Sequence, residues 1–377
     1  MATNPRTIIE KLPKPIRRGA ETVRVMAALG VFSDPLKLVK QWRHRAEFQR
    51  LQKALFYHRY ASALLLANEV GLFAALEKGG RTIEQTAGEL GVNPRAAEAL
   101  LRILESEGAV ERHGRRYQLS PFGAAYLAPA STFSVSPMLD LMAAQAFALA
   151  EVPRCMKSGG QPKVLDIFSK RGRYRDFLAA VNAFVDLAGR DLLQQADLPE
   201  VKDFIVGSMG VSMSALLLER FPEAKVTYGC LAHLVREIPR LREDYAVPAN
   251  RVTGMHAHGG DPSADRWGGE SYDLVFLTKK MILEPEQRMG EKFAAKAFDV
   301  LRPGGAVVLW ETIHTDFRPT PLPRAMEAVM DLIASPTGLV NTENGVRSTL
   351  ETIGYKKVEI VPCLGGQTTF VIARKPG

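Results

Sequence analysis

The sequence predicts an α/β protein with a doubly wound, largely parallel sheet, preceded by an all-helical region that includes a winged helix. Three observations lead to this prediction. In the C-terminal half, short apolar runs alternate with helical segments, which is the pattern of a doubly wound sheet. One such run, 203–206, ends in the turn Gly207-Ser208-Met209-Gly210 before a helix. Upstream, residues 60–130 show three helices followed by a two-stranded hairpin.

Length and composition limit the classes of protein to consider. A chain of 377 residues suits two domains, or one large domain with an appendage. Apolar residues make up 46% and charged residues 24%, which leaves enough for a sizeable core. Three distant cysteines without a CxxC motif favour a reduced, cytoplasmic protein without disulfides. We see no signal peptide and no apolar run of about 20 residues that would span a bilayer.

The net charge of +8 is concentrated at the N-terminus. Residues 1–60 contain 13 Lys and Arg against four Asp and Glu, so the other 317 residues carry a net charge of −1. Apolar residues recur among the basic ones between residues 21 and 60, as in basic amphipathic helices. Two interpretations stay open for the arm 1–55: contact with an anionic surface, either membrane or nucleic acid, and packing on a dimer partner.

The elements of the second region, 56–130, follow from local signals. Thr82 and Gln85 have the spacing of a capping box, and Pro94 stands in the first turn of a helix. The presumed recognition helix carries three glutamates beside two arginines, a poor match to phosphate contacts, so we expect no nucleic-acid partner. The predicted helices and hairpin strands are 61–76, 83–90, 95–107, 109–112 and 116–119.

Helices dominate residues 131–200, and strands return after residue 201. Apolar stripes on the helices 139–152, 174–184 and 187–195 indicate either core or the lining of a substrate pocket. The last strand is expected to run antiparallel to the others. The predicted strands are 204–206, 225–228, 251–255, 274–277, 306–310, 357–362 and 368–373.

Six segments carry a resemblance to a known family, among them Leu-Leu-Arg-Ile-Leu-Glu-Ser-Glu-Gly and Phe-Asp-Val-Leu-Arg-Pro-Gly-Gly. In this order they resemble class I S-adenosylmethionine-dependent methyltransferases, and in particular O-methyltransferases with an N-terminal winged-helix dimerisation domain. The basic arm and the stretch 279–283 look closest to bacteriochlorophyllide and carotenoid methyltransferases. The segments are 60–73, 100–108, 117–126, 219–223, 298–305 and 350–355.

This resemblance implies a domain plan and a set of partners. The plan is a basic arm, 1–55, a winged-helix dimerisation domain, 56–130, a helical linker that lines the substrate pocket, 131–200, and a Rossmann-like methyltransferase domain, 201–377. It implies a cytoplasmic homodimer that acts on an apolar small molecule, with contact between the arm and a membrane surface left open. The cofactor implied is S-adenosylmethionine, held by Gly207, Ser208, Gly210, Cys230, His258 and Lys279.

Four parts of the predicted site depart from the family pattern: the first-strand motif, the ribose acid, the adenine-binding aspartate and the catalytic base. Phe204, Val206 and Ser208 replace an aspartate and two glycines of the first-strand motif, and Cys230 replaces the acid that binds the ribose hydroxyls. His258 or Asp261 stands near the position of the adenine-binding aspartate, and Ile282 replaces the histidine that abstracts a proton. A thiol is a weak, uncharged acceptor, so these changes weaken the predicted cofactor site.

The remaining acid–base candidates are Glu311 and His314, at the end of the strand 306–310. If both face the cleft, the pair can transfer a proton; the alternative is that both are surface residues. His256 and His258 share one face of a strand, but no third ligand accompanies them, so no metal site is predicted. We therefore predict methyl transfer from S-adenosylmethionine to a large apolar or aromatic molecule. The alternative is a homologue that has lost methyl transfer and performs another reaction or carries a ligand.

Overall fold

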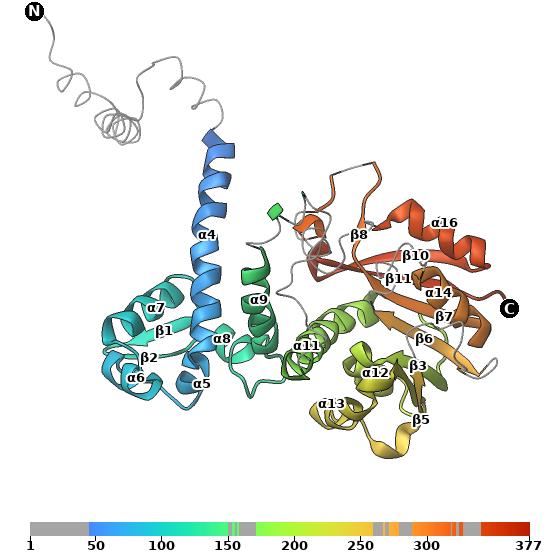
Figure 1. Ribbon diagram of the computed structural model, residues 1–377, viewed down its shortest axis with the longest axis horizontal. Helices are drawn as coiled ribbons and strands as arrows, with labels where there is room; N and C mark the ends of the chain where they lie inside the picture. Colours follow the sequence, from blue (N-terminus) through green and yellow to red (C-terminus); the bar gives the residue numbers. More distant parts are fainter. Residues whose placement is uncertain are drawn as a thin grey trace, which may run out of the picture. The chain divides into compact units, whose positions relative to one another are not determined.

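The computed structural model (Figure 1) describes residues 45–149, 153, 154, 157, 171–258, 267, 271–278, 289–317, 319–321, 324–326 and 341–377. Residues 1–44 of the predicted arm 1–55 lie outside these residues, as do Asp261, Lys279 and Ile282 from the predicted site. Two units are described separately, Met1–Ala63 and Leu64–Gly377.

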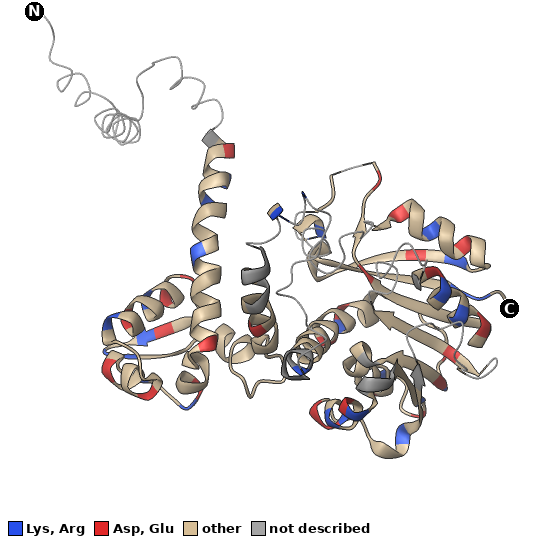
Figure 2. Ribbon diagram, viewed as in Figure 1, with Lys and Arg blue, Asp and Glu red and all other residues tan. Residues whose placement is uncertain are grey.

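A long helix, α4 (Arg45–Glu69), opens the described chain, and Figure 2 shows Lys and Arg in its first half. The single helix predicted over 61–76 is wrong, because α4 ends before Gly71 and α5 (Leu72–Glu77) begins after it. Gly71 has φ of 78°, in the left-handed region that glycine adopts without steric cost, and this residue interrupts the helix.

The other local predictions for residues 80–120 are confirmed. Thr82 accepts from the Gln85 N–H at 3.2 Å, and the Thr82 N–H donates to Gln85 Oε1 at 3.0 Å, which completes the capping box of α6 (Ile83–Leu90). Asn93 caps α7 (Pro94–Ser106). The antiparallel hairpin of β1 (Val110–His113) and β2 (Arg116–Leu119) follows. Its role as the wing of a dimerisation domain stays a prediction.

Among the described residues, the helices α8 (Pro121–Tyr126), α9 (Ser136–Leu149) and α11 (Arg171–Gln195) precede the sheet. The two helices predicted over 174–184 and 187–195 are one continuous helix, α11. No glycine or proline stands at the predicted break, and Asp186 pairs with Arg190 one turn further on. The helix therefore continues through residue 186.

The seven-stranded sheet has the order β10-β11-β7-β6-β3-β4-β5. The pairs of β3 with β4 and β6, of β4 with β5, and of β6 with β7 are parallel. β11 runs antiparallel to both of its neighbours, as predicted. The strands are β3 (Asp203–Gly207), β4 (Lys225–Leu231), β5 (Val252–His258), β6 (Tyr272–Thr278), β7 (Leu301–Glu311), β10 (Lys356–Cys363) and β11 (Thr368–Arg374).

Helices cover both faces of this sheet. One core cluster joins Phe204, Val206 and Phe276 to α11, α12 (Val211–Arg220) and α13 (Ile238–Asp244). The other joins Ile205 and Val275 to α14 (Met289–Val300) and α16 (Glu343–Ile353). Successive residues of β3 thus enter opposite cores, because side chains alternate across a strand. The doubly wound α/β fold is confirmed.

A charge network fixes the amino ends of β3, β6 and β7. Arg302 donates to Asp273 at 2.8 Å and to Asp203 at 3.0 Å. Asp273 also accepts the backbone N–H groups of Lys202 and Asp203 at 2.8 and 2.9 Å. Burial raises the pKa of Asp273, but these hydrogen bonds and the Arg302 charge outweigh it, so the net pKa lies below the ordinary 3.8.

We expect Asp273→Asn to lower the free energy of unfolding by about 2 kcal/mol at neutral pH, since it removes charge-assisted hydrogen bonds. A carboxyl whose pKa is lowered by folding stabilises the fold above its unfolded pKa and loses this effect as the pH falls through the folded pKa. The gap between the two proteins should therefore close below pH 3.8. Urea unfolding between neutral and acidic pH measures it. Asp203→Asn, at a more exposed carboxylate, is the matched control and should cost less.

Candidate functional site

The carboxyl ends of β3 and β6 form the topological switch point of the sheet. From β3 the chain passes to β4 on one side, and it later returns to β6 on the other side. Ligands of open α/β sheets bind in the crevice at such a point. Here β3 ends at Gly207, and the short 3-10 helix η2 (Ser208–Gly210) leads into α12. The predicted ligand loop thus stands at the expected place in the fold.

The fold requires glycine at one of the two glycine positions of this loop and not at the other. Gly207 has an extended backbone, φ −73°, and a Cβ added to it would lie 3.6 Å from the Gly229 carbonyl oxygen, an ordinary contact. A Cβ on Gly210 would lie 2.6 Å from two ring carbons of the buried Phe276. Packing alone therefore requires glycine at 210, whereas the fold tolerates a side chain at 207.

Accordingly, Gly210→Ala should lower the free energy of unfolding by about 1–3 kcal/mol through overpacking against the Phe276 ring. The cost should be smaller in a Phe276→Leu background, and denaturant unfolding of the two single variants and the double variant gives this coupling. Gly207→Ala is the matched control and should leave stability nearly unchanged. Equal costs in both backgrounds would refute the packing explanation.

The N-terminus of α12 is partly occupied by protein groups. The Ser212 N–H donates to Asn182 Oδ1 of α11 at 2.9 Å. The Ser214 hydroxyl contacts the Val211 carbonyl at 2.6 Å and the Tyr228 hydroxyl at 2.8 Å. The buried Asn182 side chain thereby caps one of the N–H groups that a helix N-terminus otherwise offers to an anion. A ligand at this turn is left with the backbone before Ser212.

The Cys230 thiol does not face the crevice. Cys230 is 1% exposed and belongs to the core cluster beneath α12 and α13, together with Tyr228 two residues earlier. Burial raises the pKa of the thiol to about 11, so it stays protonated at neutral pH. The side chain at the predicted ribose position is therefore an apolar core group. For two further predicted residues, Ser208 and His258, the structure describes the backbone but not the side chain.

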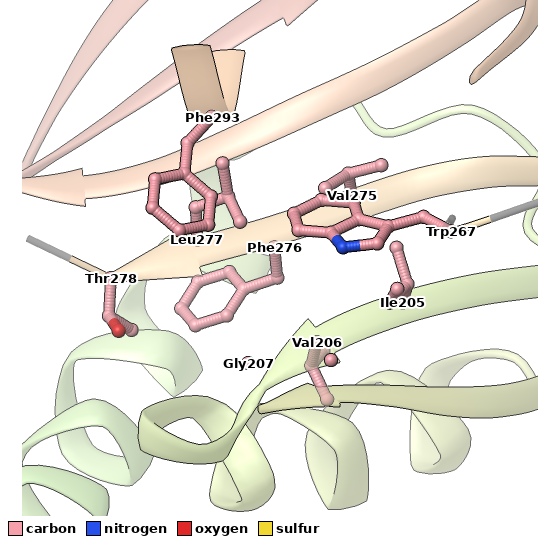
Figure 3. Close-up of a pocket in the computed structure, with 10 residues that line it drawn as sticks. Ile205, Val206, Gly207, Trp267, Val275, Phe276, Leu277, Thr278 and Phe293 are labelled. Atoms are coloured by element: carbon pink, nitrogen blue, oxygen red, sulfur yellow. The ribbon is translucent and has the colours of Figure 1, made fainter. Parts of the chain in front are cut away.

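A small cavity of about 20 Å³ lies at the ends of β3 and β6 (Figure 3). Trp267 and Phe293 form one wall, with ring centroids 6.0 Å apart, and Gly207 and Thr278 border it. The volume holds about one water molecule, so aromatic side chains fill most of this space. Trp267 was not among the residues predicted to belong to the site, although a single indole in the polar stretch 259–271 is typical of a buried anchor.

Glu311 and His314 lie at the carboxyl end of β7. Glu311 ends β7 and is 1% exposed; His314 lies in β8 (Ile313–His314), which pairs with β9 (Asn341–Thr342). The two positions are three apart in the sequence, so along an extended chain their side chains point to opposite faces. The register therefore gives no support to a Glu–His pair, and each residue is considered alone.

His314 has the environment of a neutral imidazole. Burial lowers the pKa of its ring, and the guanidinium of the buried Arg324 lowers it further. Its Nε2 is buried and has no hydrogen-bond partner among the described residues. Arg324 donates to the Ile313 carbonyl at 3.0 Å, which anchors β8 beside the ring. At neutral pH this ring carries a lone pair able to accept a proton.

Comparison with known proteins identifies relatives. No protein-family model matches the chain. It is 25% identical over 284 residues to the 3-hydroxy-5-methyl-1-naphthoate 3-O-methyltransferase of Streptomyces sahachiroi, over 72% of this chain and 79% of that protein. It is 23% identical to the tetracenomycin polyketide synthesis 8-O-methyl transferase TcmO of Streptomyces glaucescens, over 83% and 93%. The chain is a homologue of O-methyltransferases.

The solved structures agree with this assignment at the level of the fold. The structure of human N-acetylserotonin methyltransferase, in complex with SAM, superposes with a TM-score of 0.76 at 17% identity. The match covers 88% of this chain and 98% of that one. The fold of the chain thus matches that of this methyltransferase along nearly the whole length of both chains.

Proposed function

We propose that the chain transfers a methyl group from S-adenosylmethionine to a hydroxyl of a polycyclic aromatic small molecule. The observation that supports this most is the Gly207–Gly210 turn at the switch point of a fold whose curated relatives are named as O-methyltransferases. Two of those relatives are named for naphthoate and tetracenomycin methylation, which motivates the aromatic acceptor.

The backbone of the crevice fits this cofactor better than its side chains do. Gly207, at the end of β3, pairs with Gly229, two residues before the end of β4, so neither strand carries a side chain at this pair. Cys230, in contrast, offers no carboxylate to the ribose. When bound, the sulfonium supplies an electrophilic methyl group. The turn then orients its methionine end, and His314 is the proposed acceptor of the hydroxyl proton, with Glu311 a second candidate from the sequence.

A second candidate is a homologue that has lost methyl transfer and retains the pocket for another reaction or for ligand carriage. The burial of Cys230 and the filling of the switch-point cavity by Trp267 and Phe293 favour it. The two candidates differ in one measurable property, the affinity for S-adenosylhomocysteine, the molecule that S-adenosylmethionine becomes when it has lost its methyl group.

Calorimetric titration with S-adenosylhomocysteine separates the candidates. We expect saturable heat, with an affinity about 10- to 100-fold weaker than in a relative that has the ribose acid, because one charge-assisted hydrogen bond contributes ~1.5–3 kcal/mol. Gly207→Val, which places a branched side chain over the bare backbone, should abolish this heat while the protein stays folded. No heat from the wild type at high micromolar ligand would exclude methyl transfer.

We also propose that the chain forms a homodimer through residues 56–130. The support is the family resemblance of this segment and the helix and hairpin order that the structure gives it. Light scattering of the full chain should give twice the monomer mass of 41.5 kDa. A monomer at micromolar concentration would contradict the proposal.

A further inference from the structure

The first half of α4 carries an exposed apolar stripe. Phe48, Leu51 and Leu55 are 45–64% exposed, and Phe56 at its border is 62% exposed. Their spacing of three, then four residues places the first three on one face of the helix. Large apolar side chains exposed together on one helix face mark a surface that contacts another apolar phase.

Basic residues accompany this stripe. Arg50 and Lys53 are exposed and lie on the side of the helix away from the stripe, and Arg59 stands one turn beyond Leu55. The chain that precedes α4, residues 1–44, contains nine Lys and Arg against three Asp and Glu. The apolar stripe therefore belongs to the most basic part of the protein, and Figure 2 shows the basic positions on α4.

We propose that the first half of α4 binds the surface of an anionic lipid bilayer. The stripe enters the boundary between headgroups and acyl chains, and the basic residues contact the headgroups. Arg59 can extend its charged end to the headgroups while its stem lies along the apolar layer.

Charge complementarity favours this occupant over two others. A second copy of the chain brings another segment of net charge +9, and the rest of the molecule, at −1, offers little to neutralise it. Nucleic acid would satisfy the basic residues but leave the stripe of Phe48, Leu51 and Leu55 in water. An anionic bilayer satisfies both features at once.

The contact is peripheral. Among the described residues, no helix is long and apolar enough to cross a bilayer. The inference does not depend on methyl transfer, because it rests on the exposed residues of α4 and on the sequence charge of residues 1–60. If both proposals hold, α4 brings the protein to the phase in which apolar aromatic acceptors dissolve.

Co-sedimentation of the full chain with vesicles rich in phosphatidylserine tests the proposal. The wild type should pellet with them, and should pellet much less with pure phosphatidylcholine vesicles or at high salt. Arg50→Ala with Lys53→Ala should reduce binding about fivefold per lost charge. Leu51→Ser with Leu55→Ser should reduce it by about tenfold or more. Tyr57→Ser, an exposed aromatic on the opposite side of the helix, is the matched control and should bind as the wild type does.

Thermal unfolding and light scattering of each variant complete the test. Unchanged unfolding assigns a loss of binding to the surface rather than to the fold. Failure of the wild type to pellet, or equal pelleting of the Leu51→Ser, Leu55→Ser variant, overturns the proposal. A drop in molar mass of that variant in the absence of lipid also overturns it, because the stripe then contacts a second copy.

Discussion

Replacing Cys230 by aspartate is expected to lower the free energy of unfolding by about 3–5 kcal/mol, because the new carboxylate would be buried without a partner. The family pattern has an acid at this position, so sequence reasoning alone would expect the substitution to restore a ribose contact. The structure instead predicts a loss of stability with no gain in ribose binding, since the thiol is 1% exposed and packs in the same core cluster as Tyr228. Urea unfolding at neutral pH measures the effect.

Two controls make this measurement specific. Cys230→Val keeps an apolar side chain of similar size and should cost less than about 1.5 kcal/mol. Cys230→Ala leaves a small cavity and should cost about 1 kcal/mol. If Cys230→Asp were as stable as the wild type and bound S-adenosylhomocysteine more tightly, position 230 would have to face the ligand, and the placement of β4 in the core would be wrong.

The fold was accessible from the sequence because its signals are local and periodic. The alternation of Phe204, Ile205 and Val206 between two apolar cores is visible as an apolar run before a glycine turn. Thr82 and Gln85 indicate the start of a helix because the side chain of each bonds the backbone N–H of the other, three residues away. The errors lie where a single residue decides whether a helix ends or continues. Gly71 breaks a helix by adopting positive φ, and no pattern showed that α11 continues through Asp186.

The site was less accessible, because burial depends on partners far along the chain. A match to the family motif assigns Cys230 a position but not the face of β4 on which its side chain lies. That face is fixed by the register of β4 against β3, where Val206 pairs with Tyr228. Trp267 and Phe293 meet only after the sheet is assembled, so the aromatic wall of the cavity has no local signature.

The second large effect concerns proton transfer. With a hydroxynaphthoate probe as acceptor, His314→Gln should lower kcat by about 10²–10⁴-fold if the ring accepts the hydroxyl proton. The burial and the Arg324 charge that lower the pKa of His314 keep the ring neutral at neutral pH. The wild-type kcat/KM should therefore fall only when the pH drops below the ordinary histidine pKa of 6.5, and the variant should lose this limb. Initial rates of S-adenosylhomocysteine release measure both.

Acceptors of different acidity distinguish a base from a residue that only supports the fold. An acidic phenol is already ionised and needs no base, so the ratio of wild-type to variant rates should shrink as the pKa of the acceptor falls. A ratio that is the same for all acceptors would make His314 a structural residue of β8. Full activity of the variant with every phenol would mean that proximity and orientation in the crevice supply the rate. In that case the replacement of the family histidine by Ile282 would be compatible with methyl transfer, and the acceptor would have to enter as its anion.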